Sequence, residues 1–136
     1  MKLIIAFLLT FSCLANFNGK WSGEGFYQTP KTVGKCLEVF MQFKVTKDRF
    51  SILDGGYICG EIQASYPPSS FKVLNGELFY LGENVGTISE NEININYDNG
   101  IYHLRLVKEN GEIRFQENWD DGEDYLSISS KISLLL

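Results

Sequence analysis

The chain has 136 residues, of which 12 are basic and 17 acidic, and its formal net charge is −5. This length allows one domain. The acidic balance, with no basic patch in the sequence, disfavours nucleic acid and anionic membrane surfaces as partners, because both present negatively charged phosphate groups. Aromatic residues make up 14% of the chain, a high content that is typical of proteins built from β-sheets.

The first fifteen residues resemble a secretory signal peptide. Lys2 supplies the positive start, residues 3–11 form an apolar run, and Cys13 and Ala15 are small residues at the −3 and −1 positions of a cleavage site. The run is shorter than the roughly 20 residues that span a bilayer. We therefore expect a signal peptide over 1–15 and one exported domain over 16–136, located in the periplasm or outside the cell. The alternatives are a buried first element, or a lipoprotein signal in which Cys13 carries the lipid.

The stretch that follows this leader predicts the first strand of the domain. Residues 19–27 alternate between two faces, and one of these faces carries Trp21, Gly23, Gly25 and Tyr27. A large ring followed by two positions without side chains predicts a strand that bends sharply around a small core.

A hairpin with two cysteines comes next. Residues 36–45 alternate in period two, and the chain reverses at 47–48. A two-residue loop there places Cys36 directly opposite Cys59, with Cα atoms about 4.5 to 5.5 Å apart, within disulfide range. An exported chain with this pair of cysteines is expected to join them. A bulge at the glycine pair 55–56 would shift the register by one residue.

The same alternation predicts the two faces of this hairpin. The inward face is expected to hold Leu37, Val39, Met41, Phe43 and Val45, with Phe50, Ile52 and Ile58 on the return strand. The outward face is expected to carry Phe40, Leu53 and Tyr57, which would form an apolar patch for a protein partner.

From residue 60 onward the sequence predicts a meander of short strands. Turn residues recur about every ten positions, the strongest being the Asn75-Gly76 hairpin signal. The expected strands cover 60–66, 71–74, 77–81, 85–88, 92–97, 101–108, 112–119 and 125–134. We predict an all-β fold, a single closed antiparallel up-and-down barrel of eight to ten strands, because closure removes the exposed edges of a sheet of short strands. A β-sandwich is the alternative.

The opening strand carries a resemblance to a known family. Gly19-x-Trp21 resembles the motif of lipocalins and the wider calycin superfamily, and the seven residues from Gly19 to Gly25 resemble the opening strand of nitrobindin-like barrels. Small exported bacterial lipocalin-like proteins are similar in the same stretch. The resemblance implies a calycin barrel with Gly19 and Trp21 as structural signature residues. It also implies a late-strand arginine packed over Trp21, for which Arg105 and Arg114 are the candidates.

The nitrobindin-like part of the resemblance implies haem bound by a late-strand histidine. The only histidine here is His103, which the alternation of its strand turns outward, away from a barrel interior. The sequence also departs from that pattern after Phe26, where Tyr27-Gln28-Thr29-Pro30 replaces Tyr-Pro-Thr. We therefore expect no cofactor, with haem as the weaker alternative.

Catalytic and metal sites find little support in the sequence. One histidine and two bridged cysteines leave no nucleophile–base set of recognisable spacing, so we expect no enzyme. The acidic run 120–124 offers oxygen ligands for calcium but lacks the spacing of a calcium loop. A solvated turn is the preferred interpretation, and we expect no metal site.

One carboxylate interrupts an apolar row. Glu117 lies between Phe115 and Trp119 on the inward face of its strand, and a buried carboxylate must pair, protonate or bind a ligand. The structural interpretation, which we prefer, is an internal salt bridge or a group at the barrel mouth that reaches water. The functional one is a polar anchor in a ligand cavity. Candidate cavity-lining residues are Tyr27, Phe43, Tyr66, Tyr80, Tyr97 and Tyr102, which the alternative assigns to a plain core.

Three functional hypotheses follow. The first is an exported lipocalin-like barrel that binds a small apolar ligand. The second is a structural or protein-interaction module with a filled barrel. The third is a haem or redox protein, or an enzyme that uses the barrel mouth. The volume of the interior separates the first two hypotheses, because a filled barrel has no room for a ligand.

Overall fold

The structure is a computed structural model that describes residues 15–136. Apart from Ala15, the predicted signal peptide lies outside the described residues, and so does Cys13. No helix within the described part of the chain has the length and apolar character needed to cross a membrane.

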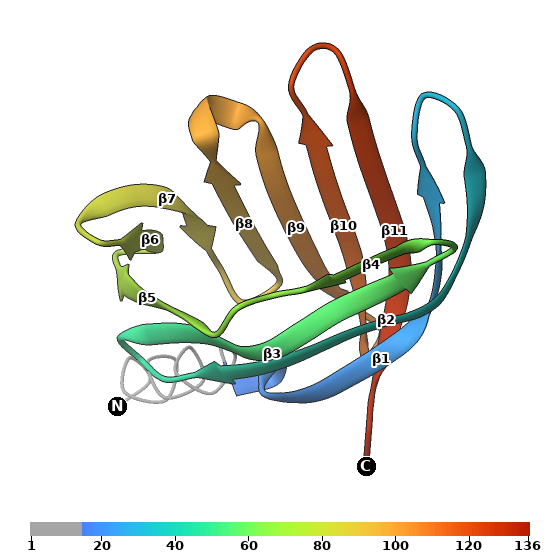
Figure 1. Ribbon diagram of the computed structural model, residues 1–136. Coiled ribbons are helices and arrows are strands. Elements are labelled where there is room, and N and C mark those ends of the chain that lie inside the picture. The colour runs from blue at the N-terminus through green and yellow to red at the C-terminus, as the bar shows by residue number, and fades with distance from the viewer. Residues whose placement is uncertain (1–14) are drawn as a thin grey trace, which may run out of the picture.

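The chain folds into antiparallel strands with almost no helix, as the sequence predicted (Figure 1). The strands are β1 (Gly19–Gln28), β2 (Val33–Val45), β3 (Arg49–Cys59), β4 (Ile62–Ser65), β5 (Ser69–Leu74), β6 (Glu77–Tyr80), β7 (Glu83–Ile88), β8 (Glu92–Tyr97), β9 (Tyr102–Glu109), β10 (Glu112–Asp120) and β11 (Tyr125–Leu134). Two single-turn 3-10 helices accompany them, η1 (Ala15–Phe17) and η2 (Asp98–Gly100).

The sheet closes into a ten-strand up-and-down barrel. Each strand of the ring pairs with its sequence neighbour, and β1 pairs with β11 to complete the circle. The eleventh strand, β4, continues the line of β5 along the same edge of β3, with the break at Pro67 and Pro68. Proline cannot donate a ladder hydrogen bond, which explains why the strand is interrupted there. The predicted closed barrel is confirmed, and the sandwich is not formed.

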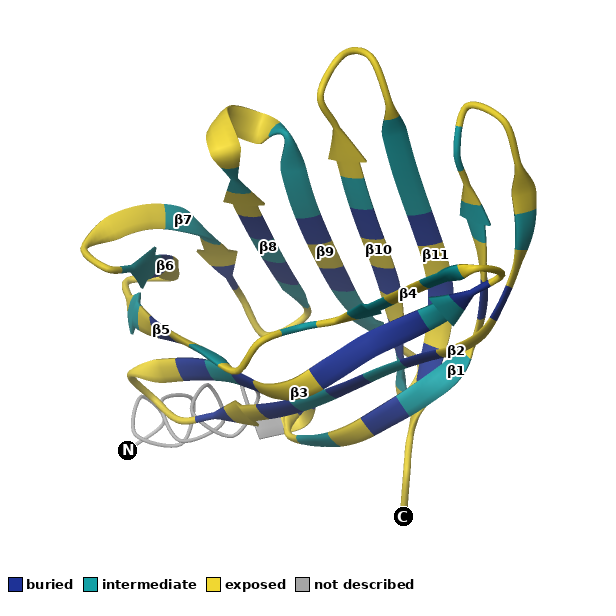
Figure 2. Cartoon of the chain, in the orientation of Figure 1, coloured by how far each residue is buried: buried dark blue, intermediate teal, exposed yellow. Residues whose placement is uncertain are grey.

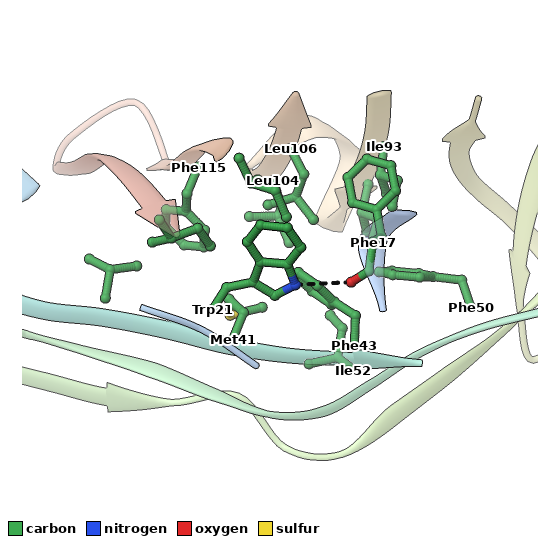
Figure 3. Close-up of a cluster of buried hydrophobic side chains, with 14 of the residues drawn as sticks. Phe17, Trp21, Met41, Phe43, Phe50, Ile52, Ile93, Leu104, Leu106 and Phe115 are labelled. Atoms are coloured by element: carbon green, nitrogen blue, oxygen red, sulfur yellow. Dashed lines mark hydrogen bonds between the residues drawn. The ribbon is translucent and has the colours of Figure 1, made fainter. Parts of the chain in front are cut away.

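One end of the barrel is closed by the segment that precedes β1. Phe17, in η1, is completely buried, and Trp21 is 2% exposed. The Trp21 indole N–H donates a hydrogen bond to the Phe17 carbonyl over 3.0 Å, and both rings point into the main apolar cluster (Figure 3). The buried rings of Phe17 and Trp21, and the hydrogen bond between the two residues, therefore hold the segment before β1 against this end of the barrel.

The cation over Trp21 is a lysine. The Lys108 ammonium lies 5.1 Å from the centre of the Trp21 ring and donates a hydrogen bond of 2.9 Å to the Asn16 carbonyl. The arginine expected from the family resemblance is absent from this position, because Arg105 pairs with Glu92 and Arg114 with Glu109 on the outer face.

The predicted disulfide is confirmed. Cys36 and Cys59 oppose each other directly on β2 and β3, their Cα atoms are 3.9 Å apart, and an S–S bond of 2.07 Å joins them. The register between them is not regular, however, because it shifts twice along the hairpin. The shifts lie at Leu53 on β3 and at Leu37 on β2, and they cancel before the cysteines are reached. No shift occurs at the glycine pair 55–56.

These two bulges overturn part of the predicted face assignment. An extra residue at Leu53 turns the rest of β3 over, so that Tyr57 is 6% exposed and faces the interior while Ile58 does not. The extra residue at Leu37 likewise leaves that side chain 77% exposed. The predictions of an outward Tyr57 and of an inward Leu37 and Ile58 were therefore wrong.

Buried residues form bands along the middle of the strands, whereas the hairpin tips are exposed (Figure 2). The core includes Trp21 and Phe17 and continues through Phe43, Phe50 and Phe71, whose ring centres are 5.5 and 5.8 Å apart in succession. Eight-stranded barrels have interiors that side chains can fill, and ten strands enclose a wider one. The wider interior leaves unfilled space toward the opposite end.

Candidate functional site

A cavity of about 460 Å³ lies in the half of the barrel opposite the end that Phe17 and Trp21 close, which we call the open half. Strands from both walls contribute to it, β3, β4 and β5 on one side and β8, β9 and β10 on the other. It is lined by Ile52, Tyr57, Ala64, Ser65, Tyr66, Pro67, Ser69, Phe71, Tyr80, Ile95, Tyr97, Asp98, Tyr102, Leu104, Glu117 and Trp119.

Glu117 is the polar centre of this cavity and is only 4% exposed. The Tyr57 hydroxyl donates to its Oε2 atom over 2.7 Å, and the Tyr102 hydroxyl donates to Oε1 over 2.9 Å. The Tyr66 hydroxyl also donates to Oε1 and lies 2.8 Å from the Tyr102 hydroxyl. Three tyrosines from three parts of the chain therefore converge on one carboxylate, which we call the tyrosine–glutamate cluster (Tyr57, Tyr66, Tyr102 and Glu117).

The pKa values of the three tyrosine hydroxyls in the cluster are strongly raised. Burial raises the pKa of the Tyr57, Tyr66 and Tyr102 hydroxyls well above the usual value, and the charge of Glu117 raises each of them further. Burial also raises the pKa of Tyr97 to about 12, with a smaller contribution from Tyr80. The hydroxyls are therefore neutral donors throughout the physiological range.

Local sequence explains how three of the four members reach the cluster. The regular alternation of β10 turns Glu117 inward, between Phe115 and Trp119. Tyr66 is held at the end of β4, where its N–H donates to the Gly55 carbonyl over 2.8 Å, directly before the proline break. Tyr57 is directed inward by the bulge at Leu53.

Aromatic rings form a continuous wall beside the cluster. Phe71 and Tyr80 have ring centres 5.5 Å apart, Tyr80 and Tyr97 meet edge to face at 6.2 Å, and Tyr97 and Tyr102 are 5.9 Å apart. Such tilted and edge-to-face pairs are the favoured geometry of aromatic side chains. The cavity therefore combines an aromatic wall with one buried charge.

The comparison with known proteins adds no assignment. No protein-family model matches this chain, and no curated protein matches its sequence. The site must be interpreted from its own geometry.

Most of the residues predicted to line a cavity meet in one place. Tyr66, Tyr80, Tyr97, Tyr102 and Glu117 all line it. The partners of Glu117 are hydroxyl groups, whereas the preferred sequence interpretation expected a salt bridge or contact with water; neither of the two salt bridges found within residues 15–136 includes it.

Two predicted residues lie elsewhere. Phe43 is buried in the closed half of the barrel, with its ring 5.5 Å from that of Phe50. Tyr27 packs against the backbone at Gly34 and Gly60, where an added Cβ atom would come within 2.6 Å of its ring or hydroxyl. Neither residue lines the cavity.

Tyr57 is the functional candidate that the sequence interpretation placed on the wrong face. The available signal was the Asp54-Gly55-Gly56 stretch, which indicated a bulge in this strand without giving its position. The bulge lies one residue earlier, at Leu53, and this position decides which side chains face inward.

The remaining polar candidates lie outside the cavity. The His103 Nε2 atom is 3.2 Å from Asn94 Oδ1, between the neighbouring strands β8 and β9. In the turn 120–124, backbone N–H groups of Asp124 and Glu123 bind the Asp121 carboxylate and lower its pKa. Within the described residues no group of three or more metal-ligating side chains is found.

Proposed function

We propose that this protein is an exported lipocalin-like barrel of the calycin type that binds a small, largely apolar ligand in the cavity around Glu117. The observation that carries the proposal is an aromatic cavity of about 460 Å³ whose lining includes a single buried carboxylate, that of Glu117. Ligand pockets usually have volumes of about 300 to 1,000 Å³, with apolar walls and a few convergent polar groups that orient the ligand.

Export is the second part of the proposal. The Cys36–Cys59 disulfide suits an oxidising compartment, because cellular reducing systems keep the thiols of cytosolic proteins reduced. The charged start and apolar run of residues 1–15 agree with the same assignment. The destination we propose is the periplasm or the extracellular space.

The alternative functions have less support. A filled interaction module does not account for the cavity, and the apolar patch expected around Tyr57 is reduced because that ring faces inward. A haem protein of the nitrobindin-like type would need a histidine in the cavity as its axial ligand, and His103, the only histidine of the chain, does not line it.

Fluorescence titration with N-phenyl-1-naphthylamine, a neutral apolar probe, tests the binding function. Ala64 lines the cavity, whereas its neighbour Gln63 is exposed on the opposite face of β4. We expect Ala64→Trp to weaken probe binding by at least about tenfold, because the indole fills the space, whereas Gln63→Trp leaves binding within about twofold of the wild type. Equal binding by both variants would place the probe elsewhere and remove the proposal.

Native mass spectrometry of protein purified from its own host provides an independent test. A ligand retained in the cavity appears as an additional mass on the folded protein, and it is expected to be lost from Ala64→Trp. Its mass identifies the chemical class of the ligand.

A further inference from the structure

We propose that the cavity selects a small amphiphile with a cationic ammonium head, which sits beside Glu117 with its apolar body against the aromatic wall. This inference rests on the proposed binding function and deepens it by naming the class of ligand. It follows from three features of the cavity, which are its charge, its free hydrogen-bonding capacity and its aromatic lining.

All of the ionisable charge that lines the cavity is negative. The buried Glu117 and the exposed Asp98 both line it, and the lining residues include no lysine, arginine or histidine. The ion pairs within residues 15–136 join Arg105 to Glu92 and Arg114 to Glu109, outside the cavity. Hydrogen bonds solvate the Glu117 carboxylate but do not neutralise it, and a buried charge without a counter-ion is costly. A cationic ligand supplies this counter-ion.

The carboxylate also retains capacity for a donor. Two carboxylate oxygens offer about four acceptor positions in total. Among residues 15–136, Tyr66 and Tyr102 donate to Oε1, whereas Tyr57 alone donates to Oε2. One acceptor position on Oε2 is therefore left for an N–H group of a ligand, and a charge-assisted bond of this kind is about twice as strong as a neutral one.

The aromatic lining favours the same class of ligand. Tyr80, Tyr97, Tyr102 and Trp119 present rings to the cavity, and the faces of such rings carry negative potential. Cations are attracted to these faces, and sets of rings around a cation are the usual receptor for organic ammonium groups. An anionic head would meet the charge of Glu117, and a neutral head would leave that charge uncompensated.

The test uses three probes that share one apolar chain and differ in the charge of the head. Octylammonium, octanol and octanoate are titrated into the wild-type protein by calorimetry near pH 7, below the concentrations at which they aggregate. We expect octylammonium to bind at least about tenfold more tightly than octanol, and octanoate to bind most weakly.

Two variants with the same change in net charge locate the origin of this preference. Glu117→Gln removes the cavity charge while keeping the size of the side chain, and we expect the ratio of octanol to octylammonium dissociation constants to fall to about one. Glu90→Gln removes an exposed charge in the turn between β7 and β8, and the ratio should keep its wild-type value. The wild-type comparison needs no variant and remains decisive if Glu117→Gln fails to fold.

The outcomes separate the inference from the function beneath it. Octanol or octanoate binding as tightly as octylammonium overturns the cation preference but leaves a ligand-binding barrel. A preference that persists in Glu117→Gln also overturns the inference, because another group must then supply it. If none of these probes binds and N-phenyl-1-naphthylamine does not bind either, the proposed function itself fails.

Discussion

At the scale of single residues, Glu117 and its tyrosine donors are the most unusual feature of the molecule. This carboxylate is 4% exposed and accepts hydrogen bonds from three hydroxyls, and no cation among residues 15–136 forms an ion pair with it. Such a network stabilises the fold only while each donor is present, because a lost donor leaves a buried acceptor unpaired. The three hydroxyls are therefore expected to matter for stability as well as for binding.

Replacing Tyr57 by Phe tests this role. Tyr57 is the one donor to Glu117 Oε2 in the part of the chain that the structure describes, so we expect Tyr57→Phe to lower the free energy of unfolding by about 1.5 to 3 kcal/mol, as measured by urea denaturation. Tyr125→Phe is the matched control. Its hydroxyl accepts one exposed bond from Gln28, and its loss should cost less than about 0.5 kcal/mol. Equal costs for the two variants would contradict the role of the cluster.

The raised pKa values of the tyrosines predict alkaline behaviour. An unfolded tyrosine ionises near pH 10, whereas Tyr57, Tyr66, Tyr97 and Tyr102 keep their protons to higher pH in the native state. The native state then binds more protons than the unfolded chain above about pH 10, so the free energy of unfolding falls as pH rises from there through about 12. Below pH 10 these groups cause no change.

Ultraviolet titration of tyrosinate measures this effect. Four of the seven tyrosines should ionise late, and those of the cluster only as the protein unfolds. Ionisation of all seven near pH 10, with the circular dichroism of the native protein retained, would show that the cluster does not form.

At the scale of elements, the β2–β3 hairpin decides the composition of the site. Its two bulges, at Leu53 and Leu37, shift the register in opposite directions, so the cysteines still lie opposite each other. After the bulge at Leu53, the side chains of β3 point to the faces opposite to those that simple alternation predicts. Bulges commonly re-aim a side chain next to a functional site. The inward Tyr57 is the result in this hairpin, and the disulfide holds the end of the strand that carries it.

Removing the disulfide is expected to weaken the fold without changing its topology. The bond joins residues separated by 23 positions, and closing a loop of this length stabilises a protein by about 3 kcal/mol in the chain-entropy model. We expect a Cys36→Ala, Cys59→Ala double variant to lose about this amount in urea denaturation and to keep its β-sheet circular dichroism. A reducing agent should have the same effect on the wild type and none on the double variant.

At the scale of the whole molecule, the barrel has a structural half and a binding half. The segment 15–18 and the Trp21 cluster fill one end (Figure 3), and the cavity occupies the other. The two tryptophans lie in different halves, since Trp21 is 2% exposed in the core and Trp119 is 38% exposed at the cavity. Stability and ligand affinity should therefore respond separately to mutations in the two halves.

The same substitution at each tryptophan tests this division. We expect Trp21→Phe to cost about 2 kcal/mol of stability, through the lost bond to the Phe17 carbonyl and the lost ring volume, with unchanged affinity for N-phenyl-1-naphthylamine. Trp119→Phe should show the reverse, with a stability change below about 1 kcal/mol and weaker probe binding. Urea denaturation and fluorescence titration measure the two quantities, and a shared response would contradict the division.

The local pattern of the sequence was sufficient for the architecture. Alternation and turn residues predicted the strands, and a two-residue loop predicted the contact of Cys36 with Cys59, because both depend on neighbours along one hairpin. The inward position of Glu117 followed from the alternation of a strand that has no bulge.

The tertiary structure alone decided what surrounds that carboxylate. A bulge depends on how a strand must curve to close the barrel, so the inward face of Tyr57 was not readable from its own strand. Tyr66 comes from a distant segment that ring closure brings to Glu117, whereas Tyr102 lies on the strand next to β10, opposite Trp119. The division into a filled end and an open end has the same origin, because packing depends on the volumes of side chains from all ten strands together.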